Sequence, residues 1–204
     1  MILSPATAKT LALLIKRQPD FLKSFYLTGG TALALQIGHR ESEDLDFFSP
    51  KSFEPIKIEQ SLSQYGKLSQ TKLDKGTLNT YLNGVKLQFL EYPYPLIKPT
   101  TKWGSISLSS VEDIAATKIQ TIGMRGSKKD FVDLYFLLKQ FTLPDLFALM
   151  AKKYARVDYS QTHLLKSLVY FADAETQPLP KMHQPVTWDQ VKKTIVSAVK
   201  AIKF

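Results

Sequence analysis

The amino-acid sequence predicts an α+β protein in which a small mixed-sheet core is followed by a helical region. Before residue 110, short apolar runs typical of strands alternate with helical patterns, and the pair Asn83-Gly84 marks a β-hairpin. From Ser110 onward, the apolar residues recur with the spacing of helices. We therefore expect two domains, an α/β core at residues 1–109 and a helical domain at residues 110–204.

Each element of the first half has a local signal. The apolar run Phe25–Leu27 stops at the glycine pair Gly29-Gly30, which is typical of a strand that ends in a turn. Good helix formers fill Thr31–Ile37, and Gly38 has the usual role of a glycine that ends a helix. In chain order we expect a helix at 5–16, a strand at 25–27, a helix at 31–37, a strand at 45–48, a helix at 56–65 and a hairpin of strands at 77–82 and 85–92.

The second half begins with a signal for a helix start. Ser110 is followed three residues later by Asp113, a spacing that resembles a capping box and predicts a helix to about Ile122. After a glycine-containing loop at 123–127, the apolar residues at 131, 134, 135 and 138 form one stripe of a second helix, 128–140. Further helices are expected at 144–154, 161–171 and 189–202.

Composition limits the classes of protein that this chain can be. Hydrophobic residues make up 44% of the 204, which is ordinary for a globular protein. No apolar run approaches the roughly 18–20 residues that cross a bilayer, and the amino terminus lacks a signal-peptide pattern, so we expect a cytoplasmic protein without a membrane partner. The absence of cysteine excludes disulfides and thiolate metal sites. The net charge of +9 would attract polyanions such as nucleoside triphosphates or RNA, although charge alone is weak support for either.

Three features of one stretch, residues 27–48, predict a phosphate and metal site. The first is Gly29-Gly30 at a strand-to-helix junction, where the missing side chains let the backbone approach a triphosphate closely. The unpaired amide groups and the positive dipole at the start of the next helix favour negative charge, and the Thr31 hydroxyl adds a donor. A Gly-Gly turn seen alone is usually only a turn.

The second feature is the pair Asp44 and Asp46, which flank Leu45. Alternate side chains of a strand share a face, so both carboxylates point one way while Leu45 points into the core. Two carboxylates on one face are suited to a pair of Mg²⁺ ions, one holding triphosphate oxygens and the other activating an attacking hydroxyl. An Asp-x-Asp pair on a strand is more often a solvated face, but its position one short helix after the glycine pair favours the metal site.

The third feature is Arg40 with Ser42, just before the carboxylates. An arginine is suited to bidentate contact with a phosphate, and Ser42 more plausibly fixes the turn. Other chemistries have little support in this sequence. The three histidines lack metal-ligand spacing, the glycine pair is not followed by the lysine of a P-loop, and no GxSxG nucleophile elbow occurs.

The string GGTALALQIGHRESEDLDFF resembles the signature of the AbiEii/AbiGii toxin family of nucleotidyltransferases, within the DNA-polymerase-beta-like superfamily. The later string DIAATKIQTIGMRGSKKDFVDLYFLL also resembles that family, less specifically. The resemblance runs from about Phe25 to Tyr170. It implies a metal-dependent transferase that moves a nucleoside monophosphate from an NTP to an acceptor, in a bacterial toxin–antitoxin or phage-defence setting.

Carried onto this sequence, the resemblance implies that residues 29–31 cradle phosphate and that Asp44 and Asp46 bind the metal. It also implies that Lys118 contacts the triphosphate and that Asp130 is a catalytic or site-organising acid. From the residues alone, Lys118 lies on a largely apolar helix, where its stem could equally run along the surface to water. Asp130 lies in the first turn of its helix, where the dipole favours an acid in any case. By resemblance, the acceptor is tRNA and the protein partner is a cognate antitoxin.

One position departs from the expected pattern. Transferases of this superfamily usually place a third carboxylate on a later strand, where it serves as the base for the attacking hydroxyl. Here that strand carries Gln88, which cannot accept a proton, and Glu91 has the opposite parity. Either Asp130 supplies the base, or metal activation suffices, or activity is reduced. Two alternatives therefore stay open: a nucleotide-binding protein without catalysis, and an aminoglycoside-type transferase that acts on a small molecule.

Overall fold

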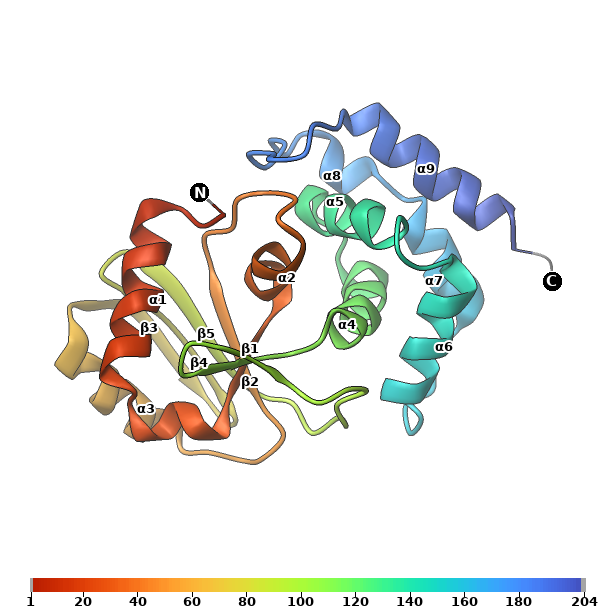
Figure 1. Ribbon diagram of the computed structural model, residues 1–204. Helices are drawn as coiled ribbons and strands as arrows, with labels where there is room; N and C mark the ends of the chain where they lie inside the picture. Colours follow the sequence, from red (N-terminus) through yellow and green to blue (C-terminus); the bar gives the residue numbers. More distant parts are fainter. Residues whose placement is uncertain (1, 203–204) are drawn as a thin grey trace.

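The computed structural model describes residues 2–202, and within them the chain forms one mixed sheet with helices on both faces (Figure 1). The strand order is β3-β4-β5-β2-β1-β7-β6. β1 pairs parallel with β7 and antiparallel with β2, and β2 pairs parallel with β5. The strands are β1 Tyr26–Thr28, β2 Leu45–Ser49, β3 Leu68–Asp74, β4 Thr77–Leu82, β5 Val85–Glu91, β6 Thr101–Trp103 and β7 Ile106–Leu108.

The helices of the first half lie around the sheet, and those of the second half gather on one side of it (Figure 1). The α-helices are α1 Pro5–Arg17, α2 Gly29–Ile37, α3 Pro55–Leu62, α4 Val111–Met124, α5 Lys128–Leu137, α6 Leu143–Lys153, α7 Gln161–Leu168, α8 Ala172–Glu175 and α9 Trp188–Lys200. Two short 3₁₀ helices, at Asp20–Ser24 and Ser63–Tyr65, connect elements of the first half. The predicted α+β class with a mixed sheet and a helical second half is confirmed.

Local signals in the sequence explain several element ends. Asn83 and Gly84 both have positive φ, 51° and 83°, as a two-residue hairpin turn between β4 and β5 requires. Gly38 ends α2 in the left-handed conformation with φ of 62°. The Ser110 side chain accepts from the backbone N–H of Asp113 and so caps α4.

The structure differs from the sequence-based elements at α2 and at strands β3, β6 and β7, and it also contains α8 and the 3₁₀ helix Asp20–Ser24, which were not predicted. α2 begins at Gly29, so the glycine pair forms its first turn and does not precede it. β3 was not predicted, because a register shift between Ser69 and Lys72, with Gln70 at φ of 52°, breaks the alternation that marks a strand. β6 and β7 were not predicted either, since each has three residues and β7 exists through its long-range pairing with β1.

The core is one continuous cluster of buried apolar side chains that extends from the sheet into the helical half. Aromatic residues are prominent in it: the Phe89 ring stacks on Phe47 at 5.1 Å and meets Phe21 and Phe25 edge-on. The predicted boundary between residues 109 and 110 falls between β7 and α4. None of the helices within residues 2–202 is both long enough and apolar enough to cross a membrane.

The core predicts a large cost for truncating Phe89. We expect Phe89→Ala to lower the free energy of unfolding by about 3–5 kcal/mol, because it removes a fully buried ring in contact with three others. Denaturant unfolding of the purified protein measures this. The matched control is Ile56→Ala on α3, whose side chain is 45% exposed and whose loss should cost under about 1 kcal/mol. Equal losses for the two variants would contradict the described core.

Candidate active site

A pocket of about 430 Å³ lies where the sheet meets α4 and α5. Most of the residues predicted as site residues line it, although they come from both halves of the chain. Its lining consists of Gly30, Arg40, Ser42, Asp44, Asp46, Lys86, Gln88, Lys118, Arg125, Gly126, Ser127, Lys129, Asp130, Asp173 and Gln177. Gly29 and Thr31 do not line it. The pocket therefore combines the two carboxylates expected for a metal with a surplus of basic side chains.

The glycine pair is required by the protein's own side chains. Gly29 has a positive φ of 67°, and a Cβ placed there would lie 2.5 Å from the Oδ2 of Asp46. A Cβ at Gly30 would lie 2.3 Å from the Nη2 of Arg40. No real side chain fits at such distances, so the missing Cβ atoms let Asp46 and Arg40 approach the first turn of α2. Among the residues that the structure describes, no side chain caps this turn, which leaves its amide groups to a ligand or to water.

The Thr31 hydroxyl is engaged inside the protein. It donates to the main-chain carbonyl of Asp44 and lies 2.8 Å from the Ser42 hydroxyl, and only 1% of Thr31 is exposed. These bonds tie α2 to the segment that enters β2 and so hold Asp44 in place. In this arrangement Thr31 is a positioning residue, in contrast to the phosphate donor that the sequence suggested. Ser42 fixes the turn, as expected, and also lines the pocket.

The two aspartates lie together at the start of β2. Asp46 is paired in the sheet with Thr28 and Gln88, and Asp44 immediately precedes the strand. Burial, followed by the negative charge of Asp44, raises the pKa of Asp46 above its ordinary value. The Lys129 ammonium lies 3.5 Å from the Oδ2 of Asp44. Two crowded carboxylates, one of them resisting ionisation, are a donor set that a divalent cation would stabilise.

The described residues supply two carboxylates to such a cation and no more. Within residues 2–202 no group of three His, Asp or Glu side chains gathers in a geometry fit for a metal. Gln88 occupies the neighbouring position on β5, and its amide donates to the Oδ1 of Asn79 at 3.0 Å. The residues fit Mg²⁺, which in proteins commonly takes one or two carboxylates and completes its shell with substrate phosphates and water.

A buried carboxylate that the sequence reasoning did not assign, Asp133 of α5, organises the basic side of the site. Its side chain is fully buried and contacts three basic residues. Arg40 makes a two-bond fork to it, through Nε at 2.6 Å and Nη2 at 2.9 Å. The His39 Nε2 lies 2.7 Å from the same carboxylate, and the Lys118 ammonium 2.6 Å from it. We name these four residues the Asp133 cluster.

The charges in the Asp133 cluster follow from burial and contact. Burial alone would raise the pKa of Asp133, but Lys118, Arg40 and His39 outweigh it and hold that pKa well below the usual range. Burial lowers the pKa of His39 more than Asp133 raises it. His39 is therefore a neutral imidazole that donates through Nε2, while its Nδ1 has no partner in the described part of the chain. The Asp133 carboxylate thus forms an ion pair with Arg40 and shares the ammonium group of Lys118 with Asp130.

Lys118 and Asp130 form an ion pair beside this cluster. The Lys118 ammonium lies 2.7 Å from Asp130, whose other oxygen accepts from the Ser127 hydroxyl at 2.5 Å. Although burial would raise the pKa of Asp130, Lys118 and Ser127 lower it below the ordinary value. An acid held in its ionised form is a weak proton acceptor. The geometry therefore favours a site-organising role for Asp130 over that of a base.

The segment that carries His39 and Arg40 is held from both ends of the chain. The backbone N–H of Ser42 donates to the carbonyl of Ile2 at 3.1 Å, and that of Glu41 to the carbonyl of Lys181 at 2.8 Å. The loop between α2 and β2 is thus fixed, although no regular element contains it. The sequence reasoning also missed Arg125 and Lys129, although both lie within the second family-like string. It missed Lys86, Asp173 and Gln177 as well, which reach the pocket from segments outside both strings.

The fold is that of a nucleotidyltransferase. A candidate nucleotidyltransferase from H. pylori superimposes with a TM-score of 0.59 at 19% identity, covering 97% of this chain and 94% of that one. The nucleotidyltransferase toxin MenT4 (Rv2826c) of Mycobacterium tuberculosis H37Rv gives 0.53 at 17% identity, covering 97% and 86%. At such identities the likeness concerns the fold alone.

The sequence assigns the chain more closely. It matches the family described as nucleotidyl transferase AbiEii toxin, type IV TA system, over residues 13–92 and 85–204. The uncharacterized protein aq_aa25 of Aquifex aeolicus strain VF5 is 38% identical over 182 residues, which is 86% of this chain and 86% of that protein. This chain belongs to the AbiEii nucleotidyltransferase toxin family, and the resemblance read from its motifs is confirmed.

The Asp133 cluster predicts a stability that depends on pH. We expect Asp133→Asn to lower the free energy of unfolding at pH 7 by about 3–5 kcal/mol, because it leaves buried cations without their counter-charge. The pKa of Asp133 is lowered in the folded state, so its contribution is complete above the unfolded pKa of about 3.9 and is lost as the pH falls below it.

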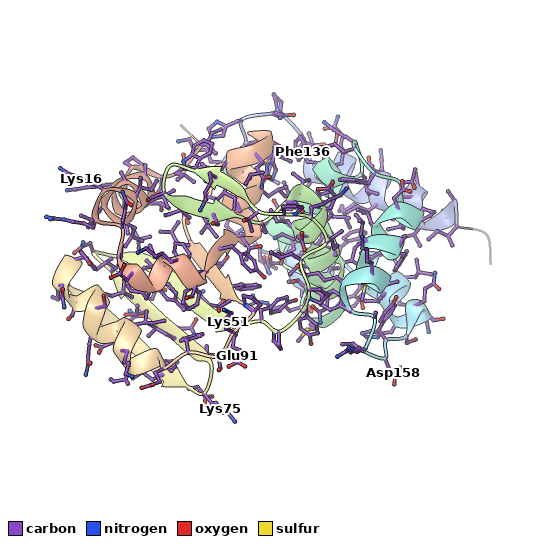
Figure 2. The ribbon with its side chains drawn as sticks, turned by 60° about the horizontal axis from the view of Figure 1, so that its bottom comes forward. Lys16, Lys51, Lys75, Glu91, Phe136 and Asp158 are labelled. Atoms are coloured by element: carbon purple, nitrogen blue, oxygen red, sulfur yellow. The ribbon has the colours of Figure 1, made fainter. Side chains whose placement is uncertain are left out.

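Denaturant unfolding at a series of pH values measures this difference. The gap between the wild type and Asp133→Asn should be constant above about pH 5 and should narrow below about pH 4. Asp158→Asn, which changes an exposed carboxylate of the helical half, is the matched control and should leave both stability and its pH dependence unchanged (Figure 2). A gap that does not narrow in acid would contradict an ionised Asp133.

Proposed function

We propose that this protein transfers a nucleoside monophosphate from an NTP to an acceptor hydroxyl, releasing pyrophosphate, as the toxin of a bacterial toxin–antitoxin pair. The observation that carries the proposal is one pocket that combines Asp44 and Asp46 with the uncapped first turn of α2 and several basic side chains. Family membership supports the same chemistry, since the family is described as nucleotidyl transferase toxins of a type IV system. That description also supports a cognate antitoxin as the protein partner.

In this proposal the triphosphate lies along the side of the pocket formed by α2, α4 and α5. The amide groups at Gly29 and Gly30 face its oxygens, and the helix dipole adds to their attraction. Arg125 and Lys129 line the same pocket and supply further positive charge. Arg40 does not contact the triphosphate through its Nε and Nη2 groups, because both already donate to Asp133. Its positive charge attracts the triphosphate from a greater distance than the charges of Arg125 and Lys129. Lys118 is held in place by its ion pairs with Asp130 and Asp133, and its positive charge likewise attracts the triphosphate.

Asp44 and Asp46 would hold Mg²⁺, most simply two ions shared with the triphosphate. When bound, Mg²⁺ would neutralise phosphate charge and lower the pKa of the acceptor hydroxyl. Residues 2–202 offer no strong base next to this position: Gln88 cannot accept a proton, and contacts with Lys118 and Ser127 weaken Asp130 as an acceptor. We therefore assign to this chain the tasks of binding, charge placement and orientation. We also propose that the two predicted domains act as one unit, with 110–204 completing the site.

We propose tRNA as the acceptor, in line with the basic balance of 27 lysines and arginines against 18 acids. The test is incubation with each α-labelled NTP, Mg²⁺ and total bacterial tRNA, followed by separation of the RNA on a denaturing gel. Label on RNA that depends on Mg²⁺ would support the proposal and identify the nucleotide. NTP binding without label on RNA would contradict the tRNA acceptor and favour either a small-molecule acceptor or binding without catalysis.

Loss of either aspartate predicts loss of transfer. We expect Asp44→Asn and Asp46→Asn each to lower the rate of labelling at least about 100-fold, since removing a direct ligand should exceed the 10–100-fold typical of residues that only support one. Asp158→Asn, again the exposed control, should label at the wild-type rate. The two site variants should stay folded by circular dichroism. Activity retained in both would mean that these aspartates do not hold the metal.

The glycine at the head of α2 predicts a second loss of activity. Gly29→Ala introduces a Cβ 2.5 Å from the Asp46 carboxylate at a position with positive φ. We expect Asp46 to be displaced, so that labelling falls at least about 10-fold and the Mg²⁺ concentration for half-maximal rate rises. Gly84→Ala is the matched control, because Gly84 also has positive φ but its Cβ would meet nothing within 4 Å. The same loss in both variants would attribute the effect to backbone strain.

A further inference from the structure

The sheet has an open polar face beside the active-site pocket. Along β4, the buried residues Leu78, Thr80 and Leu82 alternate with side chains that are only half-buried. The buried face of this part of the sheet packs against α1 and α3, which lie together on one side of it (Figure 1). The other face carries Ser69, Lys72 and Asp74 of β3, Thr77, Asn79 and Tyr81 of β4, and Lys86, Gln88 and Leu90 of β5. We name these nine residues the open face.

The open face is continuous with the pocket through the strand register. Lys86 and Gln88 line the pocket, and Gln88 is paired with Asp46. On the next strand, Tyr81 is paired directly with Lys86, and Asn79 with Gln88. Lys72 follows on β3, paired with Asn79. Since adjacent strands lie about 4.8 Å apart, the open face extends roughly 10 Å from β5 to β3.

The chemistry of the two substrates requires such an approach. Transfer forms a bond from the acceptor oxygen to the α-phosphorus and breaks the bond to pyrophosphate, with the two oxygens roughly in line. The pocket side next to α2 and α5 is suited to the triphosphate, because Gly30 in the first turn of α2 and Lys129 of α5 line it there. The acceptor must then reach Asp46 from the opposite side, which is the open face.

The side chains of the open face match a single-stranded nucleic acid. Lys72 and Lys86 are exposed cations, and Tyr81 is a half-buried aromatic ring between them on the middle strand. Basic side chains around an aromatic ring on a sheet are the combination with which proteins hold single strands, through phosphate contacts and base stacking. Asn79 adds an amide group that can bond to a base or ribose.

We propose that the open face binds the single-stranded end of the acceptor RNA, with a base on Tyr81 and phosphates at Lys72 and Lys86. This inference rests on the proposed function and names the surface that selects its acceptor. It assigns to this chain an RNA platform on the sheet, separate from the triphosphate side of the pocket. It also gives β3, which lies at the edge of the sheet, a role in RNA binding through Lys72.

The first test changes charge on the open face alone. Lys72→Gln/Lys86→Gln removes two cations from it, and Lys9→Gln/Lys16→Gln removes two exposed cations from α1, which covers the other face of the sheet and from which Lys16 projects outward (Figure 2). Binding of end-labelled total bacterial tRNA is measured by gel shift at several salt concentrations. We expect the open-face pair to weaken binding at least about 10-fold and to flatten the slope of log K against log salt by about 1.4, for two phosphate contacts.

The α1 pair should bind tRNA within about two-fold of the wild type. Binding of the α-labelled NTP, measured by equilibrium dialysis, should be unchanged in the α1 pair and in Lys72→Gln alone, because Lys72 does not line the pocket. Equal loss of tRNA binding in the two pairs would show attraction by net charge and overturn the proposal. So would a loss of NTP binding in parallel with tRNA binding in Lys72→Gln.

The second test separates stacking from charge. Tyr81→Ala should weaken tRNA binding by roughly 10-fold, in the range for loss of one stacked base, whereas Tyr81→Phe should bind within about two-fold of the wild type because the ring remains. Thermal unfolding checks that both variants are folded. If the wild type labels tRNA and Tyr81→Ala binds and labels it equally, RNA binding by the open face is contradicted, while the proposed nucleotide transfer is supported. If the wild type neither binds nor labels tRNA, the RNA acceptor and this surface fall together.

Discussion

The site depends on one buried ionic interaction, the contact of Asp133 with Arg40, Lys118 and His39. It joins the loop between α2 and β2 to α4 and α5, so it fixes the sheet half of the pocket against the helical half. A buried charge is tolerated only when partners compensate it, and here every hydrogen-bonding direction of the carboxylate is used. Because His39 is neutral, it adds a hydrogen bond without a third positive charge. The cluster thus sets the positive field of the pocket without exposing all of its cations.

A second constraint is steric and acts at the head of α2. Gly29 and Gly30 leave room for the side chains of Asp46 and Arg40, and the Thr31 hydroxyl holds the backbone of Asp44. Three consecutive residues therefore place one carboxylate, one guanidinium and one main-chain segment around the same point. Burial, and after it the negative charge of Asp44, raises the pKa of Asp46, and a divalent cation would favour its ionised form. The same geometry explains why the glycine pair and the carboxylate pair occur so close together in the chain.

The sequence predicted the elements whose signals are local and missed those that need a distant partner. The hairpin at Asn83-Gly84 and the end of α2 at Gly38 were predicted because single residues adopt backbone conformations that few others tolerate. β3 escaped because a bulge at Gln70 interrupts its alternation, and β7 because three residues become a strand only beside β1. The same division holds for the site. Asp44 and Asp46 were predicted from alternation on one strand, and both line the pocket.

What the sequence determined by itself was the family, the α+β class, and the position of the glycine pair and the two aspartates, since these follow from adjacent residues and backbone preferences. Only the tertiary structure decided what Arg40 and Lys118 contact. The Arg40 guanidinium pairs with a carboxylate 93 residues away in the chain, and a lysine on an apolar helix meets two acids of the next one. Such a pair is stable only if its attraction offsets the free energy lost when both charges leave water. That depends on which groups meet in the folded interior, and no local sequence pattern predicts it.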